Sequence, residues 1–325
     1  METIQRRHTA TLTAEALVIA YMGIIALAAH ITGINLLLFP ELAALSHDVM
    51  TRPGGKWASQ PWRLILTPTM TAIVGLFITR HASYGAVASA VIALLALAVI
   101  KLLRSAIGPA ISAGVLPMVL GEKSWLYPVS ICAGLVGLVV LLLAFKRWGP
   151  RVEASSGSSA RHSEVVDALE AYPHSRFWVL SLLAFVLVLG AAAQITGLRF
   201  ILFPPLVVMA YEIFGHPEVP GWMACPIFFP IVCFLTALIG VLADQAFQAS
   251  SLAVMLTTLC SIAVLRAFRV HMPPALAVGL LPFVMTAPNI WYPVSVGIGT
   301  VVLVLCFWAR RSFQRSYATV AAEEA

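Results

Sequence analysis

Near its C-terminal end the chain reads RAFRVHMPPALAVGLLP, a sequence in which basic side chains directly precede two prolines. The i,i+3 spacing of Arg266 and Arg269 predicts that both lie on one face of a helix, and His271 follows them. Pro273 and Pro274 favour the first turn of a second helix, because that turn does not need the N–H that proline lacks. Free N–H groups at this helix start, beside guanidinium and imidazole groups, predict a binding site for a small anion.

The first half of the chain contains a reduced version of this pattern. Lys101 and Arg104 precede Gly108-Pro109, and Ala106 stands where the second half has its histidine. Lys101, Arg104 and Pro109 are therefore the candidate binding residues of this half. An alternative remains open, because basic residues at the end of an apolar span also serve as anchors that reach the lipid headgroups.

Other polar residues inside apolar segments have two different explanations. Glu41 follows Pro40, and a charge inside a membrane span is costly enough to suggest function, although pairing with a nearby Lys or Arg would also account for it. Thr71 and Thr236 each precede a glycine by four residues. That spacing indicates bonding to the backbone or close helix approach rather than substrate binding.

The sequence offers little catalytic or cofactor chemistry. It has no nucleophile with a partnered base, no phosphate-binding glycine loop and no His/Cys/Asp cluster at metal-ligand spacing. Glu212 and His216 form the one local acid–base pair, and His216-Pro217 is more typical of a loop. We therefore expect a protein that is not an enzyme and that binds neither metal nor cofactor.

The composition indicates a membrane protein. Hydrophobic residues make up 60% of the 325 residues and charged residues only 10%, against about 25% charged residues in soluble domains. A chain this apolar requires the lipid bilayer as part of its solvent. The net charge of +6 does not indicate nucleic-acid binding, because the basic residues lie at the ends of apolar runs and in the central linker.

An internal repeat organises the chain. AAHITGIN (28–35) matches AAQITGLR (192–199), and each copy leads into a Phe-Pro. The other pairs share an offset of 165 residues: TAIVGL (71–76) with TALIGV (236–241), AVIKLLR (98–104) with AVLRAFR (263–269), GPAISAGVLP (108–117) with PPALAVGLLP (273–282), and LYPVS (126–130) with WYPVS (291–295). The chain thus contains two copies of one membrane module.

The repeat and the polar stretches together predict four parts. These are a first membrane repeat (1–145), a solvated and largely flexible cytoplasmic linker (146–174), a second membrane repeat (175–312) and a cytoplasmic tail (313–325). Within the linker, SEVVDALEAY (163–172) favours a helix that Ser163 would cap. The predicted fold is an all-α polytopic transmembrane bundle. Each repeat offers four long spans near the roughly 20 residues that cross a bilayer, and two short or re-entrant helices: 36–49 and 109–121 in the first, 199–215 and 273–286 in the second.

Basic residues predict the topology. They flank the spans at the N-terminus, in the linker and at the C-terminus, which places all three in the cytoplasm, with the chain in the cell inner membrane. Each repeat then crosses an even number of times, four or six, for eight to twelve passes in all. An even count makes the two copies parallel repeats, related by an axis along the membrane normal.

The second repeat resembles the HPP family of integral membrane proteins, which is named for a His-Pro-Pro motif. The shared features are a Phe-Pro after the first span, a long span with a basic end, a proline pair opening an apolar segment, and a final span. The motif here reads His271-Met272-Pro273-Pro274-Ala275, with Met272 inserted after the histidine. The first repeat has neither the histidine nor the first proline.

The resemblance implies transport, since some plant and cyanobacterial members of that family are linked to nitrite movement across membranes. We therefore expect an integral membrane transporter or channel for a small solute, nitrite-like and anionic, with its site between the repeats. A non-transporting membrane subunit or anchor is the alternative. The expected partners are the bilayer, the solute and a second copy of the chain in a homo-oligomer.

Overall fold

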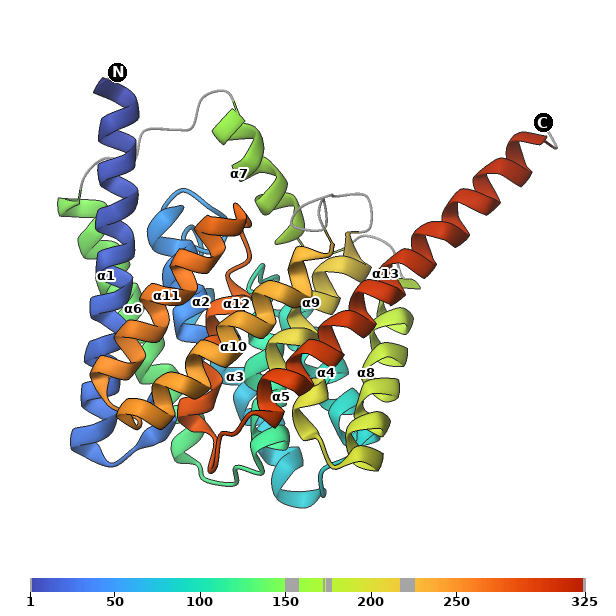
Figure 1. The fold of residues 1–325 in the computed structure, drawn as a ribbon, viewed down its shortest axis with the longest axis horizontal. Coiled ribbons are helices and arrows are strands. Elements are labelled where there is room, and N and C mark those ends of the chain that lie inside the picture. The colour runs from blue at the N-terminus through green and yellow to red at the C-terminus, as the bar shows by residue number, and fades with distance from the viewer. Residues whose placement is uncertain (1, 150–157, 172, 174–176, 217–225, 324–325) are drawn as a thin grey trace.

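The structure is a computed structural model that describes residues 2–149, 158–171, 173, 177–216 and 226–323 (Figure 1). Its regular elements over these ranges are all helices, which confirms the predicted all-α class. Seven of the helices are long and apolar enough to cross a membrane. The protein is accordingly a multi-pass membrane protein.

Each repeat contributes six α-helices. The first repeat contains α1 (Glu2–Thr32), α2 (Glu41–Thr51), α3 (Pro61–His81), α4 (Ala86–Leu102), α5 (Ala110–Leu120) and α6 (Leu126–Trp148). The second contains α8 (Phe177–Thr196), α9 (Pro204–Gly215), α10 (Phe228–Phe247), α11 (Ser251–Phe268), α12 (Pro274–Leu280) and α13 (Trp291–Glu323). Short 3₁₀ helices η1 (Asn35–Leu37), η2 (Arg199–Leu202) and η4 (Leu281–Val284) accompany them.

The linker and the tail contain more helix than the sequence predicted. α7 (Ser158–Leu169) lies in the linker, and Val166 and Leu169 on it are buried against the rest of the protein. The helix predicted in SEVVDALEAY is therefore present, and it begins five residues earlier, at Ser158. Helices α6 and α13 also continue past the predicted limits at residues 145 and 312 without a break.

The same backbone geometry recurs where the repeated ITG motif ends the first helix of each repeat. Gly33 and Gly197 both have positive φ, 69° and 75°, which glycine adopts at no steric cost. Thr32 and Thr196 each donate a 2.7 Å hydrogen bond to the carbonyl four residues earlier. The repeat in the sequence is thus a repeat in structure.

Four short helices, α2, α5, α9 and α12, form the centre of the bundle. Nearly every residue of these helices is buried, whereas the long helices around them expose one side. Prolines precede or begin each short helix, because proline tolerates a helix start but not its interior. Gly121, with φ 74°, ends α5. The proline pair therefore opens a helix, as predicted.

Glycine allows the central helices to lie against the backbone of their long neighbours. A Cβ added at Gly75 on α3 would lie 1.9 Å from the carbonyl oxygen of Gly114 on α5. Gly240 and Gly279 repeat this arrangement between α10 and α12, again at 1.9 Å. Thr71, one turn before Gly75, donates a 2.6 Å hydrogen bond to the carbonyl of Ala110. This confirms that the threonine and glycine mark close helix approach.

The repeats exchange their first helices. α1 packs against α11 of the second repeat, and α8 packs in the equivalent way against α4 of the first. At the α8–α4 contact, Gln194 accepts a 3.0 Å hydrogen bond from the backbone N–H of Ala86. The short helices also pack across the repeats, α2 with α12 and α5 with α9. The two repeats are therefore one interlocked body with a shared core.

The short helices continue the path across the bundle. Arg52, directly after α2, contacts α7, at the end of the bundle where Figure 1 shows both termini. The end of α5 lies at the opposite end, where Arg80 of α3 donates to the carbonyl of Lys123. The second repeat follows the same course. Among the described residues, the seven helices that are long and apolar enough to span a membrane include none of α2, α5, α9 and α12, so the number of passes stays a prediction of eight to twelve.

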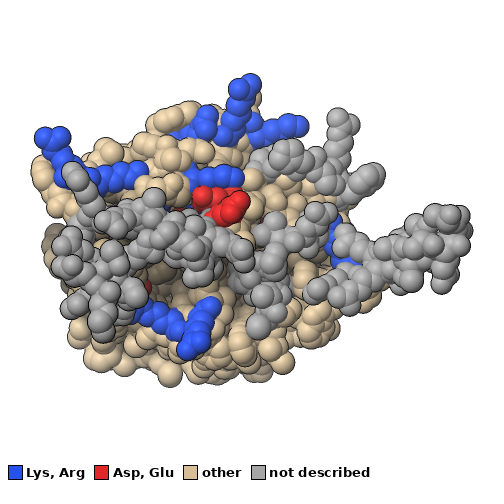
Figure 2. Space-filling model, turned by 90° about the horizontal axis from the view of Figure 1, so that it is seen from above, with Lys and Arg blue, Asp and Glu red and all other residues tan. Residues whose placement is uncertain are grey.

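Basic residues gather at the end of the bundle that carries α7. Figure 2, which looks onto this end, shows Lys and Arg side chains near its rim and acidic side chains closer to the middle. The long helices expose large apolar side chains, with Ile31, Ile195 and Val87 at least 70% accessible. Apolar exposure on this scale fits contact with lipid.

The glycine contacts predict a large effect of one methyl group. Gly75→Ala should lower the free energy of unfolding by about 3 kcal/mol, because the rigid backbone of α5 cannot move away from the added carbon. Thermal unfolding in detergent would measure this. Gly137→Ala is the matched control, since its Cβ would meet only Tyr21 at 3.7 Å, and it should stay within about 1 kcal/mol of wild type. Equal stability of the two variants would contradict the proposed packing.

Candidate functional site

The structure places the basic residues of the second repeat in separate surroundings. Arg266 at the end of α11 pairs with Glu15 of α1, with Nη2 2.6 Å from Oε2 and Nε 3.0 Å from Oε1. The residue therefore joins the exchanged helix α1 to the second repeat. Glu15 therefore neutralises the positive charge of Arg266, which the sequence analysis expected to bind a small anion.

Arg269 does not share a helix face with Arg266, contrary to the prediction. α11 ends at Phe268, and Arg269 occupies the left-handed C-cap with φ 55°. Arg104, its counterpart in the first repeat, has the same geometry with φ 48°. A left-handed residue ends the helical spacing on which the prediction rested, so the arginine points away from the face of its i−3 partner.

The helix starts after the prolines do not offer free N–H groups either. The N–H groups of Ala275 and Leu276 bond to Met272 and Pro273, each at 3.0 Å. In α5, those of Ala110 and Ile111 bond to the preceding turn in the same way. The first two amides of each helix are therefore already engaged by the preceding turn and do not supply the free donors on which the predicted anion site depended. Pro109, Pro273 and Pro274 are buried and shape the helix starts.

His271 instead belongs to a buried network of charged groups between the repeats. Its Nε2 lies 3.3 Å from Oδ1 of Asp48, a fully buried residue of α2. Arg52 lies on the other side of Asp48, with Nε 3.1 Å from the same oxygen. The ring of His47 is 6.3 Å from that of His271. The histidine of the basic segment thus ties the start of α12 to α2 of the first repeat.

Arg52 also binds the linker. Its Nη2 lies 2.7 Å from Oε1 of Glu170 and 3.1 Å from Oδ1 of Asp167. Three carboxyl groups from α2 and the linker therefore share this guanidinium. The sequence did not reveal the network, because Arg52 is separated from Asp167 and Glu170 by more than one hundred residues. Only the run HDVMTR, with its Asp and Arg four apart, carries a local signal.

Burial raises the pKa of Glu170 to about 9, and the nearby negative charge of Asp48 acts in the same direction. The guanidinium of Arg52 opposes this shift. We favour the raised value, because one guanidinium cannot balance three carboxylates in a partly dry environment. At neutral pH Glu170 therefore holds a proton, while its Oε1 still accepts the hydrogen bond from Arg52 that attaches α7.

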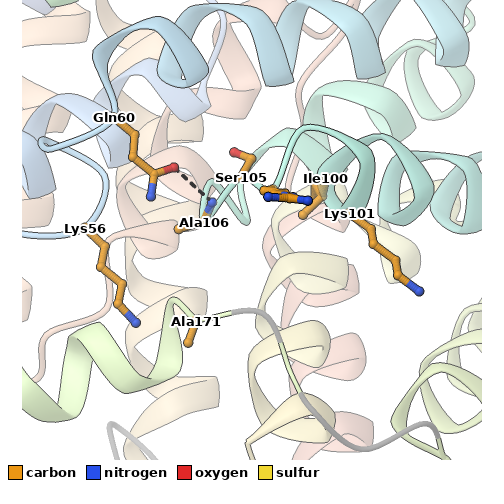
Figure 3. Close-up of a pocket in the computed structure, with 8 residues that line it drawn as sticks. Lys56, Gln60, Ile100, Lys101, Ser105, Ala106 and Ala171 are labelled. Atoms are coloured by element: carbon orange, nitrogen blue, oxygen red, sulfur yellow. Dashed lines mark hydrogen bonds between the residues drawn. The ribbon is translucent and has the colours of Figure 1, made fainter.

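Lys101 and Arg104 line a pocket of about 490 Å³ at the end of the first repeat. Lys56, Gln60, Ile100, Ser105, Ala106 and Ala171 complete its lining. Figure 3 shows Lys56 and Lys101 on opposite sides of the opening, with Ser105 and Ala106 between them. Three cationic side chains face one cavity, and no residue that lines it is acidic. The sequence predicted a site between the two repeats. The pocket lies elsewhere, because only residues of the first repeat and the linker line it.

The framework of the pocket is rigid. Trp57, only 2% exposed, donates a 2.8 Å hydrogen bond to the carbonyl of Ala106. The side chain of Gln60 accepts a 3.4 Å hydrogen bond from the N–H of Ala106. The left-handed turn at Arg104 carries the chain from α4 into the segment that starts α5. These contacts hold the loop of Lys56 against the turn of Arg104. The basic groups are therefore fixed around one space rather than spread along a helix.

A second polar site lies in the core. Glu41, at the start of α2, is 2% exposed, and its Oε1 accepts a hydrogen bond from Ser112 of α5. Its other oxygen has no hydrogen-bond partner. No Lys or Arg among the described residues pairs with it, so a structural ion pair does not account for Glu41.

Comparison with known proteins does not classify the chain. No protein-family model, no curated protein and no solved structure matches it.

The raised pKa of Glu170 predicts that attachment of α7 depends on pH. Glu170 binds its proton more tightly in the attached state, with a pKa of about 9 against 4.5, so attachment should weaken as pH rises from about 5 to about 9. A nitroxide at the exposed Glu164, in a background without native cysteines, should become more mobile over this range. Glu170→Gln should remove the dependence. An unchanged dependence in that variant would contradict the assignment.

Proposed function

We propose that this protein is a membrane transporter for a small inorganic or organic anion of the nitrite type. The observation that carries the proposal is the pocket in which Lys56, Lys101 and Arg104 face one cavity without an acidic neighbour in its lining. Arginine and lysine together supply several charge-assisted donors to a small oxyanion. The cavity volume lies within the usual range for small-molecule sites.

The position of the pocket supports transport rather than simple surface attraction. Arg104 lies six residues before α5, a central helix that contacts both α3 and α9. Movement of the turn at Arg104 would therefore reach the core shared by the two repeats. Closely packed helices with two arrangements are the usual means by which repeat-based transporters alternate access. The resemblance to the HPP family points in the same direction.

We further propose that the end of the bundle with α7 and the pocket faces the cytoplasm, as in an inner-membrane protein. Basic residues gather at that end, and loops rich in Lys and Arg remain on the cytoplasmic side. The pocket would then bind the anion from within the cell or release it there.

Fusion of reporters to the C-terminus tests this orientation. A fluorescent protein that matures only in the cytoplasm should be bright in this fusion, and alkaline phosphatase in the same place should be inactive. Active phosphatase would reverse the assigned sides and place the pocket outside.

Uptake into proteoliposomes tests the transport proposal. The panel comprises nitrite, nitrate, formate and chloride, with protein-free vesicles to subtract passive diffusion. Arg104→Gln should raise KM for the transported anion about tenfold, because it removes a charge-assisted contact worth about 1.4 kcal/mol or more.

Arg269→Gln is the matched control. It removes the same side chain from the same left-handed cap in the other repeat, and Arg269 does not line this pocket. It should leave KM near the wild-type value. An equal rise in both variants would indicate a general effect of net charge. A folded wild-type protein that moves none of the four anions would favour the non-transporting membrane subunit.

A further inference from the structure

Glu41 differs from every other acidic residue whose surroundings are described above. Glu15, Asp48, Asp167 and Glu170 all have an arginine partner. Glu41 is buried in the core, bonds to Ser112 through one oxygen, and leaves Oε2 without a partner. Helix stability does not require a carboxyl here, because its counterpart at the start of α9 is a proline.

Comparison of the repeats shows that Glu41 and Ser112 change together. In the second repeat Pro205 stands in the place of Glu41, and Ala277 in that of Ser112. The scaffold around them is the same in both copies: Tyr127 donates 2.7 Å to the carbonyl of Ala113, and its counterpart Tyr292 donates 2.6 Å to that of Val278. The polar pair is therefore an addition to one copy of a shared apolar framework.

Among the described residues, no group near Glu41 would balance a negative charge. Tyr127 of α6 and Tyr292 of α13 lie near enough for its charge to act on them, and both hydroxyls are engaged with backbone carbonyls. From α1, Tyr21 bonds to the carbonyl of Gly134, and the sequence of α12 has no titratable residue. An unpaired carboxylate in such a place costs several kcal/mol, so the carboxyl carries a proton in this conformation.

The helix that carries Glu41 also carries the charged network at its other end. Glu41 and Asp48 are seven residues apart, which places them on the same face of α2, about 10 Å apart along its axis. Asp48 contacts His271 of the second repeat. A change in packing of α2 against α12 would therefore alter the surroundings of Glu41 and of the contact between repeats together.

We propose that Glu41 is a proton-binding site that couples movement of the anion to movement of a proton. This inference rests on the proposed transport function. In the conformation described, Glu41 is a neutral carboxylic acid that accepts a hydrogen bond from Ser112 through Oε1. When α2 moves and water reaches the carboxyl, it releases the proton as H⁺ and becomes a carboxylate. One proton moving with one monovalent anion transfers no net charge across the bilayer.

The experiment compares two modes of transport in proteoliposomes, using whichever of nitrite, nitrate, formate and chloride the wild type moves. In wild type, an acidic exterior should accelerate net uptake, and a pH-sensitive dye inside should record protons entering with the anion. Glu41→Gln should lose both effects, because glutamine keeps the hydrogen bond to Ser112 but cannot release a proton. Exchange of internal for external anion should continue in this variant, because exchange needs no net proton movement.

Two further variants serve as controls. Glu41→Asp keeps the carboxyl and should keep acceleration by acid. Glu41→Pro combined with Ser112→Ala copies the second repeat, whose fold accepts this pair, and should behave like Glu41→Gln even if the single variant fails to fold.

Acceleration by acid in folded Glu41→Gln would overturn the proposal, as would loss of both transport modes. Wild-type uptake that responds to a sodium gradient and not to pH would also overturn it and leave the transport function standing. Absence of anion movement in wild type would instead reject the transport function itself.

Discussion

The close contact between backbones in the core decides most of this structure. α5 and α12 can occupy the centre only because Gly75 and Gly240 let a carbonyl oxygen of each approach α3 and α10 to a distance that excludes any side chain. Helices this short cannot span a bilayer alone, and their ends contain backbone groups that lipid cannot satisfy. The long helices enclose the short ones and shield them from lipid. The turns before α5 and α12 accept hydrogen bonds from the first N–H groups of these short helices. The proline starts and the buried surfaces of the short helices follow from that enclosure.

Symmetry of the scaffold contrasts with asymmetry of the polar groups. The ITG turns, the glycine contacts and the tyrosine hydrogen bonds occur twice. Glu41 with Ser112 belongs to one repeat alone, and His271 has alanine as its counterpart. A duplicated framework whose halves carry different side chains can bind different things at equivalent places. The pocket and the charged network lie side by side, since the N–H of Lys56 bonds to Asp167, whereas Glu41 lies seven residues before Asp48 on α2.

The sequence predicted the helical class, the membrane setting, the repeat and the roles of Thr71 and Thr236, because each depends on local pattern or on similarity between the halves. It also pointed to Lys101 and Arg104, which do line a pocket. It failed for Arg266, whose partner Glu15 is 251 residues away, and for Lys56 and Arg52, whose neighbours are brought together by folding alone. It failed for the helix starts because the turns before them use the amides. Spacing along one helix carries no information about which distant segment neutralises a charge.

The exchange of first helices has a consequence for biosynthesis. Of the helices described, α1 leaves the ribosome before all others, and its partner α11 is among the last. The face of α1 with Glu15 and Gly23 must therefore wait in the bilayer, exposed to lipid, while more than two hundred residues are inserted. α8 by contrast finds α4 already in place. The two equivalent contacts therefore form in a fixed order. The α8–α4 contact can form first, and the α1–α11 contact forms after it.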